Sequence, residues 1–291
     1  MVARRLDRPA VNVLTAHAGV PERVLAEIRA DRRVDVSPAA EAAVARLRDE
    51  HGLAGAHPLM YSDALSPTLN LYPEPVEHLP VEDRGAFGPL DHLGCVTPGL
   101  RTGGASPFGP SGRRRVFAAF GTIVWRYFEP EASAALRAVA GACARDGAEL
   151  VVGLGGYAPT GELVAELTGL GATVVDDVDQ WAALAAADAF VTHHGLKSTH
   201  EAIYHRTPML SVPFFGDQPR AAARCAELGL AIPLTHAPRA PISVEEVLAG
   251  FAALDERSAP VASALEDARG WEQRTIDDRP RLAARVADLA R

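Results

Sequence analysis

Several residue types and patterns are scarce or absent in this chain of 291 residues. Its three cysteines, at positions 95, 143 and 225, are odd in number and far apart, which argues against a disulfide framework or a zinc site and fits the reducing cytoplasm. No apolar run approaches the ~18 residues of a membrane span, and no apolar segment follows the charged N-terminus, so neither a membrane helix nor a signal peptide is expected. The net charge of −8 argues against nucleic acid as the main partner.

The motifs of several enzyme classes are also missing. There is no Walker turn and no Gly-x-Ser-x-Gly elbow, which argues against kinase-type ATP binding and against an α/β-hydrolase. The run Gly153-Leu-Gly-Gly156 lacks the third spaced glycine of a dinucleotide fingerprint. His200 and His205 are five residues apart and face different sides of a helix, whereas a zinc-protease helix needs them four apart. No metal ligands are therefore assigned.

The second half of the chain has a regular pattern. Strands are predicted at residues 116–122, 149–154, 172–178, 189–193, 208–212 and 230–234, and helices between them at 131–145, 161–170, 180–187, 197–205 and 217–228. This alternation predicts an α/β fold with a parallel sheet covered on both faces. Ligands of such a sheet bind beyond the carboxyl ends of its strands, where five polar turns gather.

The remaining segments suggest a domain division. Residues 1–96 hold predicted strands at 10–15 and 68–72 and predicted helices at 21–33 and 38–51. Residues 97–114 are dense in Gly, Pro and Ser and are interpreted as a linker. Residues 115–270 form the second domain, in which the run from Ser243 to Glu246 is interpreted as an ordinary helix cap, and residues 271–291 form a last helix that lies across another domain.

The central segment, Ala189 to Ile203, reads as a strand, a Gly turn and a helix. The N-terminus of a helix carries unpaired N–H groups and the positive end of the helix dipole, so it suits an anion such as a diphosphate. Four residues add donors there: His193, Lys197 (the only lysine of the chain), Ser198 and Thr199. Ser198 and Glu201 also have the spacing of a capping box, which would make the same turn purely structural. Five polar turns on one edge favour a ligand site over this alternative.

These residues carry a resemblance to a family. The runs from Phe190 to Glu201 and from Pro208 to Gln218 resemble the donor-binding signature of the UDP-glucuronosyl and UDP-glucosyltransferase family, which includes bacterial macrolide-type glycosyltransferases. Val116–Thr122, Val178–Gln180 and Cys225–Pro233 are similar to further blocks of that family in the same order. The resemblance covers residues 115–235 closely and residues 69–96 more weakly.

The resemblance implies a GT-B fold, with two Rossmann-like domains facing a cleft, a complete C-terminal domain and a shortened N-terminal α/β domain. It implies that the donor, a UDP- or dTDP-sugar, is held by Thr122, Val178, Gln180, His193, Gly195, Ser198, Thr199, Glu201, Asp217 and Gln218. In this set the residues around His193 hold the diphosphate, Val178 and Gln180 lie by the base, Glu201 takes the ribose, and Asp217 with Gln218 takes the sugar. No cofactor and no metal ion is expected.

The chain departs from the family at three places. His194 stands where the family usually has glycine, and Asp179 stands where it often has proline. The part before the linker is roughly 100 residues against roughly 175 after it, although paired domains should be comparable. The absent half would carry the general base, and His17 does not match that motif, so no catalytic residue is assigned.

Two functions follow from this reading. The first is a cytoplasmic, inverting, metal-independent glycosyltransferase that moves a sugar from a nucleotide sugar to a hydroxylated small molecule. The second is a truncated or auxiliary nucleotide-sugar-binding subunit, inactive without a partner that supplies the absent N-terminal half. In both, a protein partner or a second copy would cover the open N-terminal sheet, and any membrane contact would be peripheral. The acceptor, the donor base and sugar, the catalytic base and the oligomeric state stay open.

Overall fold

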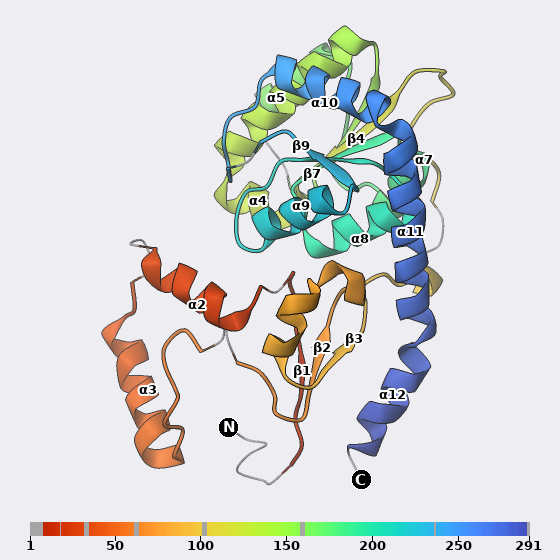
Figure 1. Ribbon diagram of the computed structural model, residues 1–291. Coiled ribbons are helices and arrows are strands. Elements are labelled where there is room, and N and C mark those ends of the chain that lie inside the picture. The colour runs from red at the N-terminus through yellow and green to blue at the C-terminus, as the bar shows by residue number, and fades with distance from the viewer. Residues whose placement is uncertain are drawn as a thin grey trace. The chain divides into compact units, whose positions relative to one another are not determined.

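The computed structural model describes residues 8–17, 19–31, 35–60, 64–100, 104–157, 161–235 and 237–289 (Figure 1). The chain divides into two units, residues 1–94 with 277–291 and residues 95–276. Parts of three predicted segments lie outside the described residues: the end of the helix at 21–33, the middle of the linker at 97–114, and the last two residues of the helix at 271–291.

The larger unit contains one sheet of six parallel strands in the order β6-β5-β4-β7-β8-β9. The strands are β4 (Arg115–Ala119), β5 (Glu149–Gly153), β6 (Thr173–Val175), β7 (Ala189–Thr192), β8 (Met209–Ser211) and β9 (Ala231–Pro233). The helices are α4 (Gly121–Tyr127), α5 (Glu129–Asp146), α6 (Gly161–Gly169), α7 (Gln180–Ala186), α8 (Leu196–His205), α9 (Gln218–Glu227), α10 (Val244–Glu256) and α11 (Ser258–Asp277). The predicted α/β class and parallel sheet are confirmed, and α4 is a helix that the pattern did not predict.

Both faces of this sheet are buried. Successive strand residues point to opposite faces, so in β4 Val116 and Ala118 pack in one core cluster while Phe117 packs in the other. The ring of Phe117 stacks on that of Phe190 in β7, with centroids 5.1 Å apart. Helices α5 and α10, side by side in Figure 1, cover the first face, and α7, α8 and α11 cover the second. Each large side chain buried in this way contributes roughly 1.5–3 kcal/mol, which makes the sheet a rigid base for its turns.

The strand order reverses between β4 and β7, in the middle of the sheet. Strands β5 and β6 extend the sheet on one side of this pair, and β8 and β9 extend it on the other. At such a reversal the connections leave the sheet in opposite directions, and a crevice opens beyond the carboxyl ends of the two strands. The turns that follow Ala119 and Thr192 border this position.

The smaller unit contains three parallel strands in the order β1-β2-β3. They are β1 (Val11–Val13), β2 (Leu69–Tyr72) and β3 (Leu90–His92), with helices α2 (Pro21–Ala30) and α3 (Pro38–His51) and short 3-10 helices at Val76–His78 and Val81–Phe87. The two strands and two helices predicted for this part are confirmed, and β3 is additional. Strands β1 and β3 are the edges of the sheet, and a protein partner on an edge stays a prediction.

The last predicted helix is in fact two helices. Helix α11 ends at Asp277, and α12 (Arg279–Asp288) begins with a proline in its first turn, which cannot continue a preceding helix. In the smaller unit α12 buries Leu282 against Leu69 and Leu71 of β2. Asp91 of β3 accepts hydrogen bonds from two α12 arginines, Arg281 (2.9 Å) and Arg285 (2.8 Å). Burial raises the pKa of Asp91, but these two hydrogen bonds, a third from the His92 N–H and the charge of Arg281 together lower it overall.

Residues 104–114 of the predicted linker pack on the larger unit. Phe108 is buried in its second core cluster. Glu149, at the start of β5, accepts hydrogen bonds from the Gly109 N–H and the Ser111 hydroxyl group, both at 2.6 Å. Among the described residues, none of the helices is long and apolar enough to cross a membrane.

Candidate functional site at the carboxyl ends of β4 and β7

The turn between β7 and α8 presents an uncapped helix N-terminus. Helix α8 begins at Leu196, and its N-cap residue Gly195 has no side chain that could accept from the helix. The first intrahelical partner of the Gly195 carbonyl group is the Thr199 N–H, at 3.0 Å. The N–H groups of residues 196–198 therefore have no partner within the helix, and the positive end of the helix dipole lies there. Such a terminus is a ready-made site for a phosphate group.

The capping-box alternative for Ser198 and Glu201 is wrong. Ser198 lies inside the helix, three residues after the N-cap, so it cannot cap the first turn. By contrast, the predicted cap at α10 is confirmed, because the Ser243 hydroxyl group accepts from the Glu246 N–H (3.2 Å) and the Glu246 carboxylate accepts from the Ser243 N–H (2.6 Å). The same spacing therefore gives a cap in one helix and not in the other.

His193 lies in the crevice between two glycines. A Cβ atom on Gly121, the first residue of α4, would lie 2.9 Å from His193 Nε2, and a Cβ on Gly195 would overlap the same atom. Only glycine at both positions leaves room for the ring. Burial lowers the pKa of His193 to about 4, and the backbone of Ala119 opposes this only in part. The ring is therefore neutral near pH 7, with one donor nitrogen and one acceptor nitrogen.

His194 holds the left-handed conformation that its place in the turn requires. Its φ is 61° and its side chain is fully buried. Its Nε2 lies 2.7 Å from the Ser211 hydroxyl oxygen, at the end of β8, and its Nδ1 lies 3.3 Å from the Thr199 hydroxyl oxygen, in the first turns of α8. Its backbone N–H donates to the Thr192 hydroxyl oxygen at 3.1 Å. A histidine thus holds here the left-handed conformation that glycine adopts readily.

A polar network joins α7 to α8 beside this turn. The Gln180 amide nitrogen donates to the Glu201 carboxylate at 2.6 Å, and the Ser198 hydroxyl group donates to the Gln180 amide oxygen at 3.3 Å. The Lys197 ammonium group lies 3.9 Å from the same carboxylate. Three predicted donor-site residues, one from α7 and two from α8, are therefore joined by hydrogen bonds, and Glu201 is only 2% exposed.

The turns after β4 and β5 also approach each other. A Cβ on Gly155 would lie 3.4 Å from the Thr122 methyl carbon, and a Cβ on Gly153 would lie 2.7 Å from the Val178 side chain. Thr122 is exposed, in the first turn of α4. The structure thus places Thr122 and Val178 at the same edge of the sheet as His193.

Two predicted donor-site residues, Thr199 and Gln218, are buried and make contacts within the protein. The Thr199 hydroxyl group contacts His194, as described above. The Gln218 amide oxygen accepts from the N–H groups of Phe214 (2.9 Å) and Phe215 (3.2 Å). Asp217 is the N-cap residue of α9 and is partly exposed. Of this pair, the Asp217 carboxylate is the more accessible group.

Sequence reasoning missed two residues that support this edge. Ser211, the partner of His194, ends a strand predicted only as an apolar run. Asp179 caps α7 by accepting from the Ala182 N–H (3.2 Å), and it also accepts from the Gly104 N–H (3.0 Å). An Asp that directly precedes a predicted helix is a recognisable cap signal, whereas no local signal marks Ser211.

The smaller unit contains a buried histidine at the corresponding end of its own sheet. His17 follows β1, and its Nδ1 lies 2.7 Å from the carboxylate of Glu74, which follows β2. Both residues are less than 10% exposed, at 7% and 2%. This pair orients the imidazole ring, and the assignment of a general base stays open.

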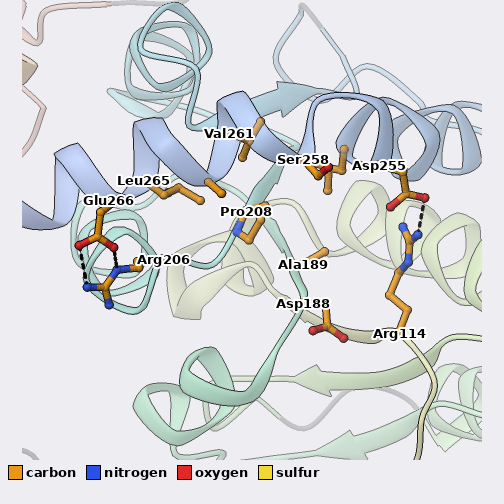
Figure 2. Close-up of a pocket in the computed structure, with 12 residues that line it drawn as sticks. Arg114, Asp188, Ala189, Arg206, Pro208, Asp255, Ser258, Val261, Leu265 and Glu266 are labelled. Atoms are coloured by element: carbon orange, nitrogen blue, oxygen red, sulfur yellow. Dashed lines mark hydrogen bonds and ion pairs between the residues drawn. The ribbon is translucent and has the colours of Figure 1, made fainter.

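A separate groove of about 320 Å³ lies at the opposite edge of the larger sheet. Arg114 directly precedes β4, Pro208 directly precedes β8, and Ala189 begins β7, so the groove is at the amino ends of the strands. Figure 2 shows an Arg114–Asp255 pair at one end, an Arg206–Glu266 pair at the other, and apolar residues of α11 between them. None of the predicted donor-site residues lines this groove.

Comparisons with known proteins agree with this geometry. The family described as UDP-glucoronosyl and UDP-glucosyl transferase matches residues 108–249. A zeaxanthin glucosyltransferase of Pseudescherichia vulneris is 33% identical over 165 residues, 55% of this chain and 38% of that protein. UDP-glucuronosyltransferase 2C1 of Oryctolagus cuniculus is 50% identical over 44 residues, 15% of this chain and 9% of that protein. The chain thus matches well under half the length of these relatives.

Solved structures extend the likeness to the whole fold. The glycotransferase of kitacinnamycin aligns with a TM-score of 0.74 at 20% identity, over 99% of this chain and 72% of that one. The calicheamicin glycosyltransferase CalG4 aligns with a TM-score of 0.70 at 18% identity, over 99% of this chain and 69% of that one. At such identities the likeness shows the fold, which is the α/β GT-B fold. The part of the chain at residues 108–249 is similar in sequence to the family described as UDP-glucoronosyl and UDP-glucosyl transferase.

Proposed function

We propose that this chain is a hexosyltransferase-type glycosyltransferase that moves a sugar from a UDP- or dTDP-sugar to a hydroxyl group of a small molecule. The observation that carries the proposal is the uncapped N-terminus of α8 at the β4–β7 reversal, flanked by His193 and the Gln180–Glu201 network. The family match over the same residues and the natural-product names of the relatives support it.

The diphosphate of the donor would bind at the helix N-terminus. The donors would be the N–H groups of residues 196–198, the Thr122 hydroxyl group from the first turn of α4, and the neutral His193 ring. The Ser198 hydroxyl group, which donates to the Gln180 amide oxygen here, would turn to donate to the diphosphate. As the bond to the sugar breaks, negative charge grows on the leaving diphosphate. Fixed donors and a helix dipole stabilise that charge, so we propose that no metal ion is required.

The remaining parts of the donor would bind along the same edge. The Glu201 carboxylate and the Gln180 amide group suit the two ribose hydroxyl groups, and the base would lie beside Val178 and Gln180. The Asp217 carboxylate and the Gln218 amide nitrogen suit sugar hydroxyl groups, since the Gln218 amide oxygen is held by the backbone.

The reaction would be a single displacement. The acceptor hydroxyl group attacks the anomeric carbon from the side opposite the diphosphate, a new C–O bond forms as the C–O bond to the diphosphate breaks, and a general base takes the hydroxyl proton. This course inverts the configuration at that carbon. The acceptor is proposed to be a hydroxylated natural-product-type molecule, in keeping with the names of the relatives.

Nucleotide binding is the first test of this function. Titration calorimetry of the full chain with UDP, dTDP and GDP should show binding of UDP or dTDP, with no change after chelation of divalent cations by EDTA. Glu201→Ala should weaken binding at least tenfold, because it removes a buried carboxylate from the ribose position. Glu266→Ala, which removes an exposed carboxylate in the groove at the other edge, is the matched control and should bind normally.

A folded chain that binds none of the three nucleotides would overturn the donor site. If binding is seen, transfer to panels of hydroxylated acceptors is then measured, and the anomeric configuration of the product is read by NMR coupling constants. Retention of configuration would contradict the single displacement. Binding without transfer, restored by a second polypeptide, would favour the auxiliary-subunit alternative.

A further inference from the structure

His194 is a buried residue in a backbone conformation that side chains rarely adopt. Its φ of 61° lies in the left-handed region, where a Cβ atom is close to the following carbonyl oxygen. Glycine would occupy this position without that cost. Such a conformation persists only when contacts with the surrounding structure stabilise it. The contacts of the His194 ring are therefore the next question.

The ring connects the start of α8 to the carboxyl end of β8, whereas the backbone joins these two elements at their other ends, through residues 206–208. Its Nε2 contacts Ser211 at the carboxyl end of β8 (2.7 Å), and its Nδ1 contacts Thr199 in α8 (3.3 Å). Each hydroxyl group can donate or accept, so both ring nitrogens are satisfied with either neutral tautomer. All three residues are at most 2% exposed. Hydrogen bonds are stronger in such a buried environment, and breaking them would leave buried polar groups without partners.

The first turn of α8 has no side-chain cap. Its N-cap, Gly195, provides no side-chain acceptor, whereas α3, α7 and α10 each have a capping side chain. A glycine N-cap leaves the orientation of the helix start less restricted. The His194 ring supplies from outside the helix the restraint that a capping side chain supplies elsewhere.

We propose that His194 is a positioning residue of the nucleotide site. Its ring fixes the first turns of α8 against the end of β8, and this holds the free N–H groups of the helix and the neighbouring His193 in the geometry that a nucleoside diphosphate requires. The proposal rests on the proposed function. Donors are effective at a developing charge only when they are held in place before the charge appears.

We call the contacts of the His194 ring with Ser211 and Thr199 the bridge, and the test compares two variants that break it. His194→Gly relieves the backbone conformation but removes both ring contacts, and Ser211→Ala leaves the backbone unchanged and removes one. Each should weaken UDP binding, by about tenfold for His194→Gly and less for Ser211→Ala, and the double variant should be no worse than His194→Gly alone, since both act on one bridge. His194→Asn, which tolerates the left-handed conformation and keeps a polar group, should lie between His194→Gly and the unaltered chain.

Two matched controls separate the bridge from general effects. Arg206→Gly relieves the same φ of 61° at the other end of α8, where the residue is exposed. Ser133→Ala removes a buried serine whose hydroxyl group has no hydrogen-bond partner among the described residues. Both controls should bind UDP as the unaltered chain does.

A measurement without ligand tests the positioning role of His194 independently of the proposed function. In the bridge variants, amide hydrogen exchange at residues 199–203, whose N–H groups donate within α8, should be faster than in the unaltered chain, whereas exchange in β7 should be unchanged. If the unaltered chain binds no nucleotide, the proposed function fails, and with it the role of His194 in binding, whatever exchange shows about the bridge. If UDP binds but both variants bind it normally with unchanged exchange, the positioning role of His194 is overturned while the proposed function stands.

Discussion

At the scale of single residues, burial decides the chemistry of the candidate site. His193 was expected to meet the donor diphosphate, and a protonated ring would be the obvious form for an anion. Its side chain is, however, almost fully enclosed between Gly121 and Gly195, and burial lowers its pKa to about 4. A neutral ring donates one directed hydrogen bond without adding a charge, which leaves the helix terminus as the main source of positive potential.

The lowered pKa of His193 predicts how stability changes with pH. The unfolded chain takes up the proton near pH 6.5 and the folded chain only near pH 4, so the free energy of unfolding falls as the pH drops through this window. The loss from this residue reaches about 3 kcal/mol at the acidic end. Urea unfolding of the unaltered chain and of His193→Gln, measured from pH 7.5 to pH 4, checks this.

Tryptophan fluorescence is a suitable probe for that experiment, because Trp125, Trp181 and Trp271 all lie in the larger unit. The variant should lose less stability than the unaltered chain between pH 6.5 and pH 4. Parallel curves for the two proteins would show that His193 does not titrate in this way. Nucleotide affinity of the unaltered chain should show no transition from His193 near pH 6.5.

At the scale of helices and strands, the capping-box spacing occurs twice but forms a helix cap only once. Ser198 with Glu201 and Ser243 with Glu246 share the capping-box spacing, but only the second pair caps a helix. The reason lies in the residues before each serine. Gly195 ends the turn after β7 and starts α8 earlier, which moves Ser198 into the helix, where its hydroxyl group contacts Gln180.

This difference predicts opposite effects for two matched variants. Ser243→Ala should lower the free energy of unfolding by about 1 kcal/mol, because it removes a capping hydrogen bond, and should leave nucleotide binding unchanged. Ser198→Ala should have a smaller effect on stability and should weaken nucleotide binding, because it removes a donor from the proposed diphosphate position. Urea unfolding and calorimetry on both proteins check this, and a stability loss at Ser198 as large as at Ser243 would contradict it.

At the scale of the whole molecule, the two units have separate cores of different size. The larger unit buries side chains on both faces of a six-stranded sheet. The smaller unit has three strands and two small clusters, one built on Leu69, Leu71 and Leu282 and the other on Tyr72, Leu79 and Phe87. Because apolar burial is the main stabilising contribution, we expect the smaller unit to unfold first.

Leu282→Ala is therefore expected to affect only the smaller unit. The change should cost 2–5 kcal/mol by the usual range for a buried leucine, since Leu282 is 2% exposed. Circular dichroism, which reports both units, should show a first unfolding transition at a lower urea concentration. The unfolding transition followed by tryptophan fluorescence, and the shift of that transition by UDP, should not change. Leu100→Ala, at a leucine that is 83% exposed, is the control. A shift of the fluorescence transition in Leu282→Ala would show that the units unfold together.

Much of the secondary structure was readable from local signals. Helix α3 has the predicted limits, with the Ser37 hydroxyl group as its cap, Pro38 in the first turn and Gly52 in the left-handed conformation at the end. The strands of the larger unit were found because they are short apolar runs between polar turns. Helix α4 was not predicted, because its uncapped start at Gly121 looks like a turn and its seven residues are too few to show a period.

The sequence alone determined the order of strands and helices, the polar turns after the strands and the resemblance in residues 115–235, because these depend on neighbours along the chain. Only the tertiary structure decided which turns meet, since the strand order places β4 beside β7. It also decided that His193 is buried and neutral and that the ring of His194 reaches Ser211. Burial and partners of this kind are set by strands that are distant in sequence, and no local pattern records them.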